Sequence, residues 1–178
     1  MKTIKITLVC AFFIFFGQGI LSQTTYVGSI NLNKKISSFS LISISDTIFV
    51  KIDKKKMEFK TPKDFLIIKT KRNNYKLVLK GDTIQIIDSK KQIEFSTGLI
   101  FNVAKKKSKN LILNDKEGKI LVNANFELKK GIAYFNIEIF DNNYLTELLS
   151  YSSYYLYYQS KNMKDSYDTS FLYFIFPN

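Results

Sequence analysis

The stretch IAYFNIEIFDNNYLTELLSYSSYYLYYQ, residues 132–159, decides the fold, because a strand pattern changes into a helix pattern within it. Residues 132–140 alternate between two faces, one apolar and the other mixed, as in a β-strand with one side in a core. The apolar face holds Ala133, Phe135, Ile137 and Ile139. This segment is the clearest strand in the chain.

Residues 144–159 contain no Val, Ile, Gly or Pro, and an Asn or Asp precedes them as a cap. Their leucines recur at helical spacing, at Leu145, Leu148, Leu149 and Leu156. Six of the eleven tyrosines also lie here, although tyrosine favours strands. We predict a helix over 144–159 that is apolar or aromatic on most sides and is therefore buried. Its tyrosines are expected to pack in the core, with their hydroxyls reaching partners.

From residue 24 to residue 140, short β-favouring runs are broken by polar turns every eight to twelve residues. Such spacing is typical of a sandwich or barrel rather than of a βαβ fold. We expect a polar loop at residues 161–170 and a final short strand at residues 171–176. The predicted fold is mainly β, an antiparallel meander forming a barrel or sandwich, with one buried C-terminal helix.

The first 22 residues have the order of a secretory signal peptide: a short positive region with Lys2 and Lys5, an apolar run, and small residues up to Ser22. The apolar run is shorter than the roughly 20 residues that span a bilayer, and an uncleaved anchor is the alternative. We predict export to the periplasm, the envelope or the extracellular space. Residues 23–178 then form a single mainly β domain.

The chain is basic, with a formal charge of +12 that falls to +10 when Lys2 and Lys5 leave with the signal peptide. Nearly all of the positive charge is lysine, and Arg72 is the only arginine. Lysine is a point charge, whereas arginine provides the planar fork that binds phosphate bidentately. The expected partner is an anionic lipid or polyanionic surface in general, and sequence-specific nucleic acid is not expected.

Lysines cluster at three predicted turns. The two clusters that we consider candidates for binding an anionic surface are Lys54, Lys55 and Lys56, and Lys105, Lys106, Lys107 and Lys109. Lys129 and Lys130 form the third. The alternative interpretation is that these lysines keep turns soluble and prevent edge strands from pairing.

The sequence excludes the commonest site chemistries. It contains no histidine, and its only cysteine, Cys10, lies in the predicted signal peptide. A Ser-His-Asp or Cys-His nucleophile, a His/Cys zinc site and a disulfide-linked partner are therefore not expected, and we predict no metal and no cofactor. Carboxylate chemistry remains open, since Glu138 shares a strand face with Asn136 and Tyr134.

The order of these elements, a meander of hairpins closed by a hydrophobic helix, resembles the tubby-like and LURP-one-related barrels. The matching positions are the turn at residues 115–118, the strand at residues 132–140 and the helix at residues 144–158. The resemblance implies antiparallel strands wrapped around one central helix. It also implies association with lipid or a membrane surface rather than catalysis.

The function that these observations favour is a non-enzymatic exported domain that binds or scaffolds at an anionic envelope or membrane surface. One alternative is an enzyme that uses carboxylates in an unfamiliar site. Another is a small outer-membrane β-barrel, which needs strands of about 9–11 residues with an uncharged lipid face.

Overall fold

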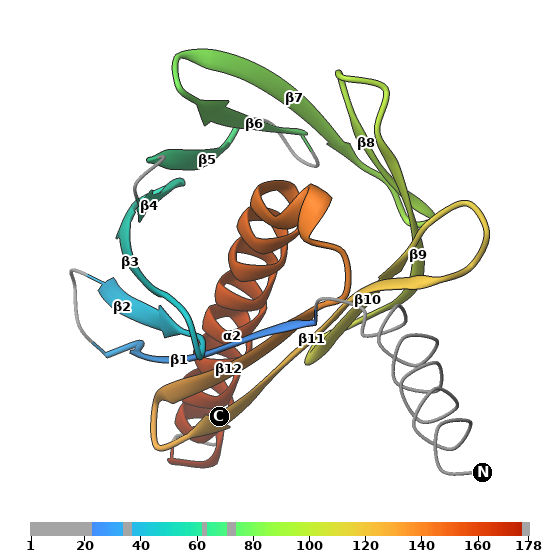
Figure 1. Cartoon of the computed structure of the whole chain (residues 1–178). Helices are drawn as coiled ribbons and strands as arrows, with labels where there is room; N and C mark the ends of the chain where they lie inside the picture. Colours follow the sequence, from blue (N-terminus) through green and yellow to red (C-terminus); the bar gives the residue numbers. More distant parts are fainter. Residues whose placement is uncertain (1–22, 34–36, 62–63, 71–73, 176–178) are drawn as a thin grey trace, which may run out of the picture.

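The computed structural model describes residues 23–33, 37–61, 64–70 and 74–175, with the side chains of residues 167–175 left out. The predicted signal peptide at residues 1–22 lies outside the described residues. Twelve antiparallel strands form a closed barrel, and neighbouring strands in the chain are neighbours in the sheet (Figure 1). The strands are β1 (Thr24–Asn31), β2 (Ser37–Ile42), β3 (Thr47–Asp53), β4 (Lys56–Lys60), β5 (Phe65–Lys69), β6 (Asn74–Leu79), β7 (Asp82–Asp88), β8 (Gln92–Phe95), β9 (Ile100–Lys107), β10 (Asn110–Asn114), β11 (Ile120–Lys129) and β12 (Ile132–Ile139).

The inside of the barrel is the hydrophobic core. Along β3, for example, Ile48, Val50 and Ile52 are buried, while the residues between them are exposed. In β12 the buried positions are Ala133, Phe135, Ile137 and Ile139, as the alternation predicts. The last strand pairs with the first over its whole length, from Thr24 opposite Ile139 to Asn31 opposite Ile132. This pairing closes the sheet, so the architecture is a barrel and not a sandwich.

One helix fills the barrel. A 3₁₀ turn, η1 (Asn142–Tyr144), leads into α2 (Leu145–Ile175), and the Asp141 side chain accepts a hydrogen bond from the Asn143 backbone N–H. All residues of α2 from 148 to 157 are buried, which confirms the predicted buried helix. Three of these residues are serines, whose small side chains let the helix lie close to the wall.

Closure of the barrel explains why a tyrosine-rich segment forms a helix. Most N–H and C=O groups of the described wall are paired between strands, so a segment inside must satisfy its own backbone groups. A helix does this within the segment. A barrel of about eight strands is filled by its own side chains, and a twelve-stranded barrel has a wider interior that can hold a helix.

The C-terminal part differs from the prediction. The helix continues through residues 161–175, where we expected a polar loop and a final short strand. Residues 161–170 contain no Gly or Pro, and an existing helix gains one hydrogen bond for each residue that it adds. A strand at residues 171–175 would need a free sheet edge, and the closed barrel offers none.

The buried helix makes a stability prediction. Leu148 and Leu149 are neighbours in the sequence and both are buried in the core. Replacing either with alanine should lower the free energy of unfolding by about 2–5 kcal/mol, through lost transfer energy and a cavity. Urea denaturation measures the change, with Ile44→Ala, at a fully exposed position, as the control. A severe effect at one leucine and none at the other would contradict the burial of both.

Candidate functional site

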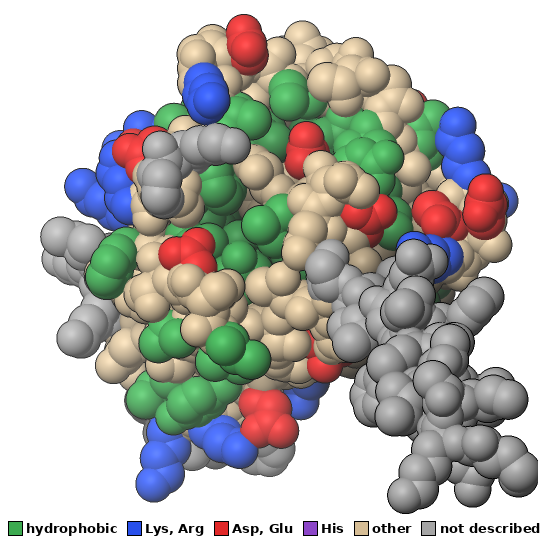
Figure 2. Space-filling view, viewed as in Figure 1, with side chains coloured by type: hydrophobic (Ala, Val, Ile, Leu, Met, Phe, Trp, Pro, Cys, Tyr) green, Lys and Arg blue, Asp and Glu red, His purple; other side chains and the backbone are tan. Residues whose placement is uncertain are grey.

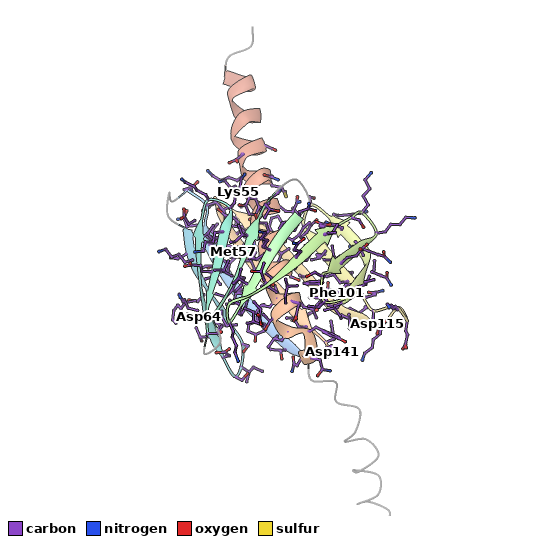
Figure 3. The ribbon with its side chains drawn as sticks, turned by 90° about the horizontal axis from the view of Figure 1, so that it is seen from above. Lys55, Met57, Asp64, Phe101, Asp115 and Asp141 are labelled. Atoms are coloured by element: carbon purple, nitrogen blue, oxygen red, sulfur yellow. The ribbon has the colours of Figure 1, made fainter. Side chains whose placement is uncertain are left out.

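The lysine-rich turns meet at one end of the barrel. In an antiparallel meander, alternate turns lie at the same end. The turns that follow β3, β7, β9 and β11 therefore lie together at the end where α2 leaves the barrel, which we call the exit end. Figure 3 shows Lys55 at this end, beside the emerging helix. The lysines in or next to these turns are Lys54, Lys55, Lys56, Lys90, Lys91, Lys105, Lys107, Lys109, Lys129 and Lys130.

The opposite end, where α2 begins, carries acidic turns, and we call it the entry end. Figure 3 places Asp64, Asp115 and Asp141 there, on the side away from Lys55. Figure 2 looks onto this end and shows acidic side chains around an apolar centre, with most visible lysines toward the outline. The entry end also has exposed lysines, at Lys60, Lys80, Lys116 and Lys119, but acidic side chains accompany them. The two ends of the barrel therefore differ in charge.

Six of the seven lysines that we predicted to bind an anionic surface lie on the surface of the exit end. Five of them are exposed: Lys54, Lys55, Lys105, Lys107 and Lys109. Lys56 is half-buried and pairs with Glu58 on its own strand. Lys106 is the exception, because its side chain points into the barrel.

A β-bulge turns Lys106 inward. The register between β9 and β10 pairs Leu113 with Val103 but Ile112 with Lys105, so Ala104 is an extra residue in β9. After the bulge Lys106 lies opposite Leu111, which is buried in the core. Without the extra residue, strict alternation from Phe101 would have pointed Lys105 and Lys107 inward. The sequence alone carries no clear signal of this bulge.

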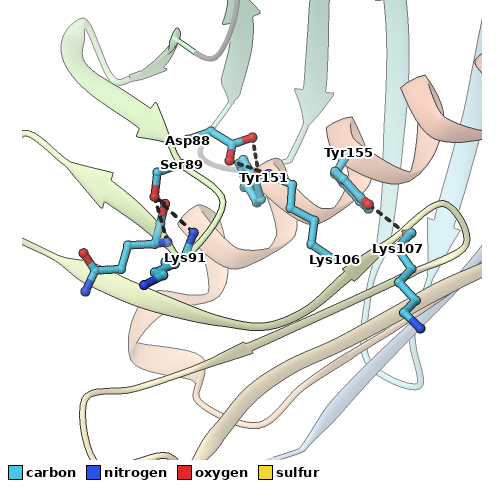
Figure 4. Close-up of polar contacts among 8 residues, drawn as sticks. Asp88, Ser89, Lys91, Lys106, Lys107, Tyr151 and Tyr155 are labelled. Atoms are coloured by element: carbon cyan, nitrogen blue, oxygen red, sulfur yellow. Dashed lines mark hydrogen bonds and ion pairs between the residues drawn. The ribbon is translucent and has the colours of Figure 1, made fainter.

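Inside the barrel Lys106 forms a closed polar network with two other residues (Figure 4). Its ammonium group pairs with Asp88 of β7 and donates a hydrogen bond to the Tyr151 hydroxyl of α2 at 3.0 Å. The Tyr151 hydroxyl in turn donates to the other carboxylate oxygen of Asp88 at 2.7 Å. The Lys106 ammonium also lies 5.5 Å from the centre of the Tyr155 ring. The network joins β7, β9 and the helix, so it fixes the rotation of α2 in the barrel.

Asp88 and burial keep the surrounding tyrosines neutral. Burial, and then the charge of Asp88, raise the pKa of Tyr155 to about 12. The same two causes, in the same order, raise the pKa of Tyr75 and Tyr151 above that of a free tyrosine. At neutral pH these phenols are hydrogen-bond donors and not tyrosinate nucleophiles. The interior network is therefore suited to holding the helix in place rather than to catalysis.

Tyrosines of α2 also hold the lysine turns. The Tyr155 hydroxyl donates a hydrogen bond to the Lys107 carbonyl oxygen at 2.8 Å. Tyr158 does the same for the Lys54 carbonyl oxygen at 2.6 Å. With the contact of Tyr151, they confirm the predicted packing and hydroxyl partners for three helix tyrosines, whereas the buried Tyr154 hydroxyl has no hydrogen-bond partner. They also tie two of the exit-end turns to the helix that passes between them.

The exit end is hollowed next to α2. A pocket of about 420 Å³ lies where the β11–β12 turn and the residues after β1 approach the helix. Basic, amide and apolar groups line it together: Asn33, Lys109, Leu128, Lys130, Gly131, Met163 and Lys164. The pocket adds a concave basic surface beside the exposed lysine turns.

Glu138, which the sequence allowed as a general acid or base, lies on the outside of the barrel. Glu138 accepts a hydrogen bond from the Asn123 side chain at 2.7 Å across β11 and β12. Tyr134, on the same face, is exposed, and the other face of β12 lines the core. The three residues Tyr134, Asn136 and Glu138 therefore lie on the outer wall and not in a barrel mouth.

No protein-family model, no curated protein and no solved structure matches this chain. Among the described residues, His, Cys, Asp and Glu form no group of three that could hold a metal ion. None of the helices in the described part is long and apolar enough to cross a membrane. The geometry and charge of the two barrel ends are therefore the observations that bear on function.

The interior ion pair makes a second stability prediction. Asp88→Asn leaves Lys106 without its counter-charge, and breaking a fully buried pair costs about 3–5 kcal/mol. Because 22% of the Lys106 side chain is still exposed, we expect a smaller loss, of about 1–3 kcal/mol. Urea denaturation measures it, with Glu127→Gln in the exposed Lys129–Glu127 pair as the control. Equal, small effects of both changes would show that the interior pair does not hold the helix.

The raised pKa values predict a loss of stability in alkali. In the unfolded chain tyrosines lose their protons near pH 10. Tyr75, Tyr151 and Tyr155 have higher pKa values in the folded state, so their contribution is complete below pH 10 and declines as the pH rises toward about 12. Denaturation at a series of alkaline pH values should show this decline. Tyr151→Phe should make it shallower, and an unchanged slope would contradict the assignment.

Proposed function

We propose that this protein is an exported, non-enzymatic domain that binds or scaffolds at an anionic envelope or membrane surface through the exit end of its barrel. The observation that carries the proposal is the convergence of lysine turns, distant in the sequence, on one end, whereas acidic and basic side chains are mixed at the other. The signal-like order of residues 1–22 supports export.

The charge difference between the ends gives the barrel a preferred orientation at an anionic surface. Each lysine near such a surface contributes about 1 kcal/mol of attraction. At the entry end, acidic and basic side chains are mixed, so their charges largely cancel and this end is attracted less. Since the exposed charges are lysines, which make no fixed fork, the attraction depends on charge density more than on one phosphate geometry.

Protection of strand edges does not account for the lysines as well as binding does. Edge strands use lysine to block pairing with other chains. A closed barrel has no edge, so this need does not arise here. Lysines placed only for solubility would be spread over both ends. Their concentration around α2 favours a role in binding.

The resemblance to tubby-like and LURP-one-related barrels is part of the proposal. That resemblance implies strands wrapped around one central helix, which is the architecture found here. It supports association with a membrane surface. The outer wall carries exposed charged side chains in mid-strand, such as Lys51 and Lys76, so a lipid-facing barrel wall is less favoured.

Vesicle binding tests the proposal with matched charge changes at the two ends. Lys55, Lys107 and Lys109 at the exit end, and Lys80, Lys116 and Lys119 at the entry end, are all exposed. Replacing the first three with glutamine should weaken binding to phosphatidylglycerol vesicles by about two orders of magnitude, at about 1 kcal/mol for each lysine. The entry-end triple variant, which has the same net charge, should bind much more like the wild type. Sedimentation with vesicles at low salt measures both.

Salt gives a second readout of the same interaction. Wild-type binding should fall steeply as ionic strength rises, because exposed charges are screened over about 10 Å at 0.1 M. Equal losses in the two triple variants would mean that net charge alone matters and that the exit end is not a binding face. No binding at low salt to vesicles or to heparin would overturn the proposal.

A further inference from the structure

Helix α2 extends well beyond the barrel. Its last buried residue among those with described side chains is Ser160, and the helix continues to Ile175. Met163 and Lys164 still line the pocket beside the lysine turns, and at about 1.5 Å per residue the part after Lys164 is about 16 Å long. Figure 3 shows this part projecting away from the strands, on the side where Lys55 lies. The projecting helix and the lysine turns therefore face the same direction.

The sequence of the projecting part changes along its length. Residues 161–170, KNMKDSYDTS, are polar and contain two basic and two acidic residues. Residues 171–175, FLYFI, are uncharged, and four of the five are aromatic or leucine. A segment of this composition is stable where an apolar phase receives it, since apolar side chains are unfavourable in water.

We propose that the exit end docks on an anionic lipid bilayer and that residues 171–175 of α2 enter the boundary between headgroups and acyl chains. This inference rests on the proposed function and names its surface. A polyanionic glycan would match the charge of the lysine turns but offers no apolar phase for the helix tip. An anionic bilayer provides both the negative charge for the lysine turns and the apolar phase for the helix tip. Phenylalanine and tyrosine are residues that favour this boundary.

The lengths agree with this placement. The tip of five helical residues is about 7 Å long, and interfacial helices bury their apolar face about 5–10 Å deep. The six polar residues between the pocket and the tip, 165–170, span about 9 Å. Headgroups occupy about 5–8 Å on each side of a bilayer. The lysine turns would then lie within one Debye length, roughly 8 Å, of the lipid surface, where their charge still acts.

A tryptophan reporter tests insertion directly, because the chain contains no tryptophan. Phe174→Trp places a single indole in the tip. Ile44→Trp places one at a fully exposed position in the turn between β2 and β3, at the entry end. With phosphatidylglycerol vesicles, the emission of F174W should shift to shorter wavelength and be quenched by brominated acyl chains, while that of I44W should not change. An unchanged F174W spectrum at saturating vesicles would overturn the inference.

A second pair of measurements separates this inference from the proposed function. Changing Phe171 and Phe174 to serine should lower vesicle affinity by about tenfold or more for each side chain. The same variant should bind heparin as the wild type does, because heparin has no apolar phase, and its unfolding midpoint in urea should not change. Wild-type affinity for vesicles in this variant would overturn tip insertion and leave the binding face intact. A blue shift of F174W without vesicles that grows with protein concentration would assign the tip to a second copy of the chain instead.

Discussion

Pairing of the first strand with the last is the constraint on which the rest of the structure depends. Once β1 lies against β12, every strand has two neighbours and the sheet has no edge. Strand pairing then takes up most backbone groups of the described wall, and the space inside is filled by a segment that pairs its own. A helix meets that condition, and the tyrosine-rich residues of α2 provide the volume to fill a wide barrel.

Tyrosine serves this role better than leucine or phenylalanine would. Its ring packs in the core, and its hydroxyl reaches polar groups at the barrel wall. Tyr151 reaches the Asp88–Lys106 pair, while Tyr155 and Tyr158 reach backbone carbonyls of two lysine turns. A purely apolar helix could rotate or slide with little penalty. Here, a displacement would break these hydrogen bonds, and the one between Tyr151 and Asp88 is buried, so its loss would be the most costly.

The same geometry links the core to the surface. In an antiparallel barrel the turns alternate between the two ends, so a sequence with lysines in alternate turns produces one basic end. The central helix leaves the barrel through that end, and its tyrosines hold the turns around it. The antiparallel barrel thus determines both the end at which the lysine turns gather and the end at which α2 leaves. A surface that binds the lysine turns also meets the end of the helix.

The sequence by itself determined the local features of this protein. The alternation of β12 and the leucine spacing of α2 depend on neighbours a few residues apart, so strand and buried helix were predictable. The absence of histidine and of any cysteine after Cys10 excluded whole classes of site chemistry. The position of lysines in turns was also predictable from the sequence, but the convergence of these turns at one end of the barrel was not.

Only the tertiary structure decided the features that depend on distant partners. Barrel closure joins Thr24 to Ile139, and no local pattern distinguishes it from a sandwich. The bulge at Ala104 reverses which lysine points inward, because one extra residue changes the face of every residue after it. Residues 171–175 have strand-like composition but form helix, since a closed barrel leaves no edge for them to join. The basic end exists because twelve strands bring distant turns together, and that is a property of the closed sheet and not of any segment within it.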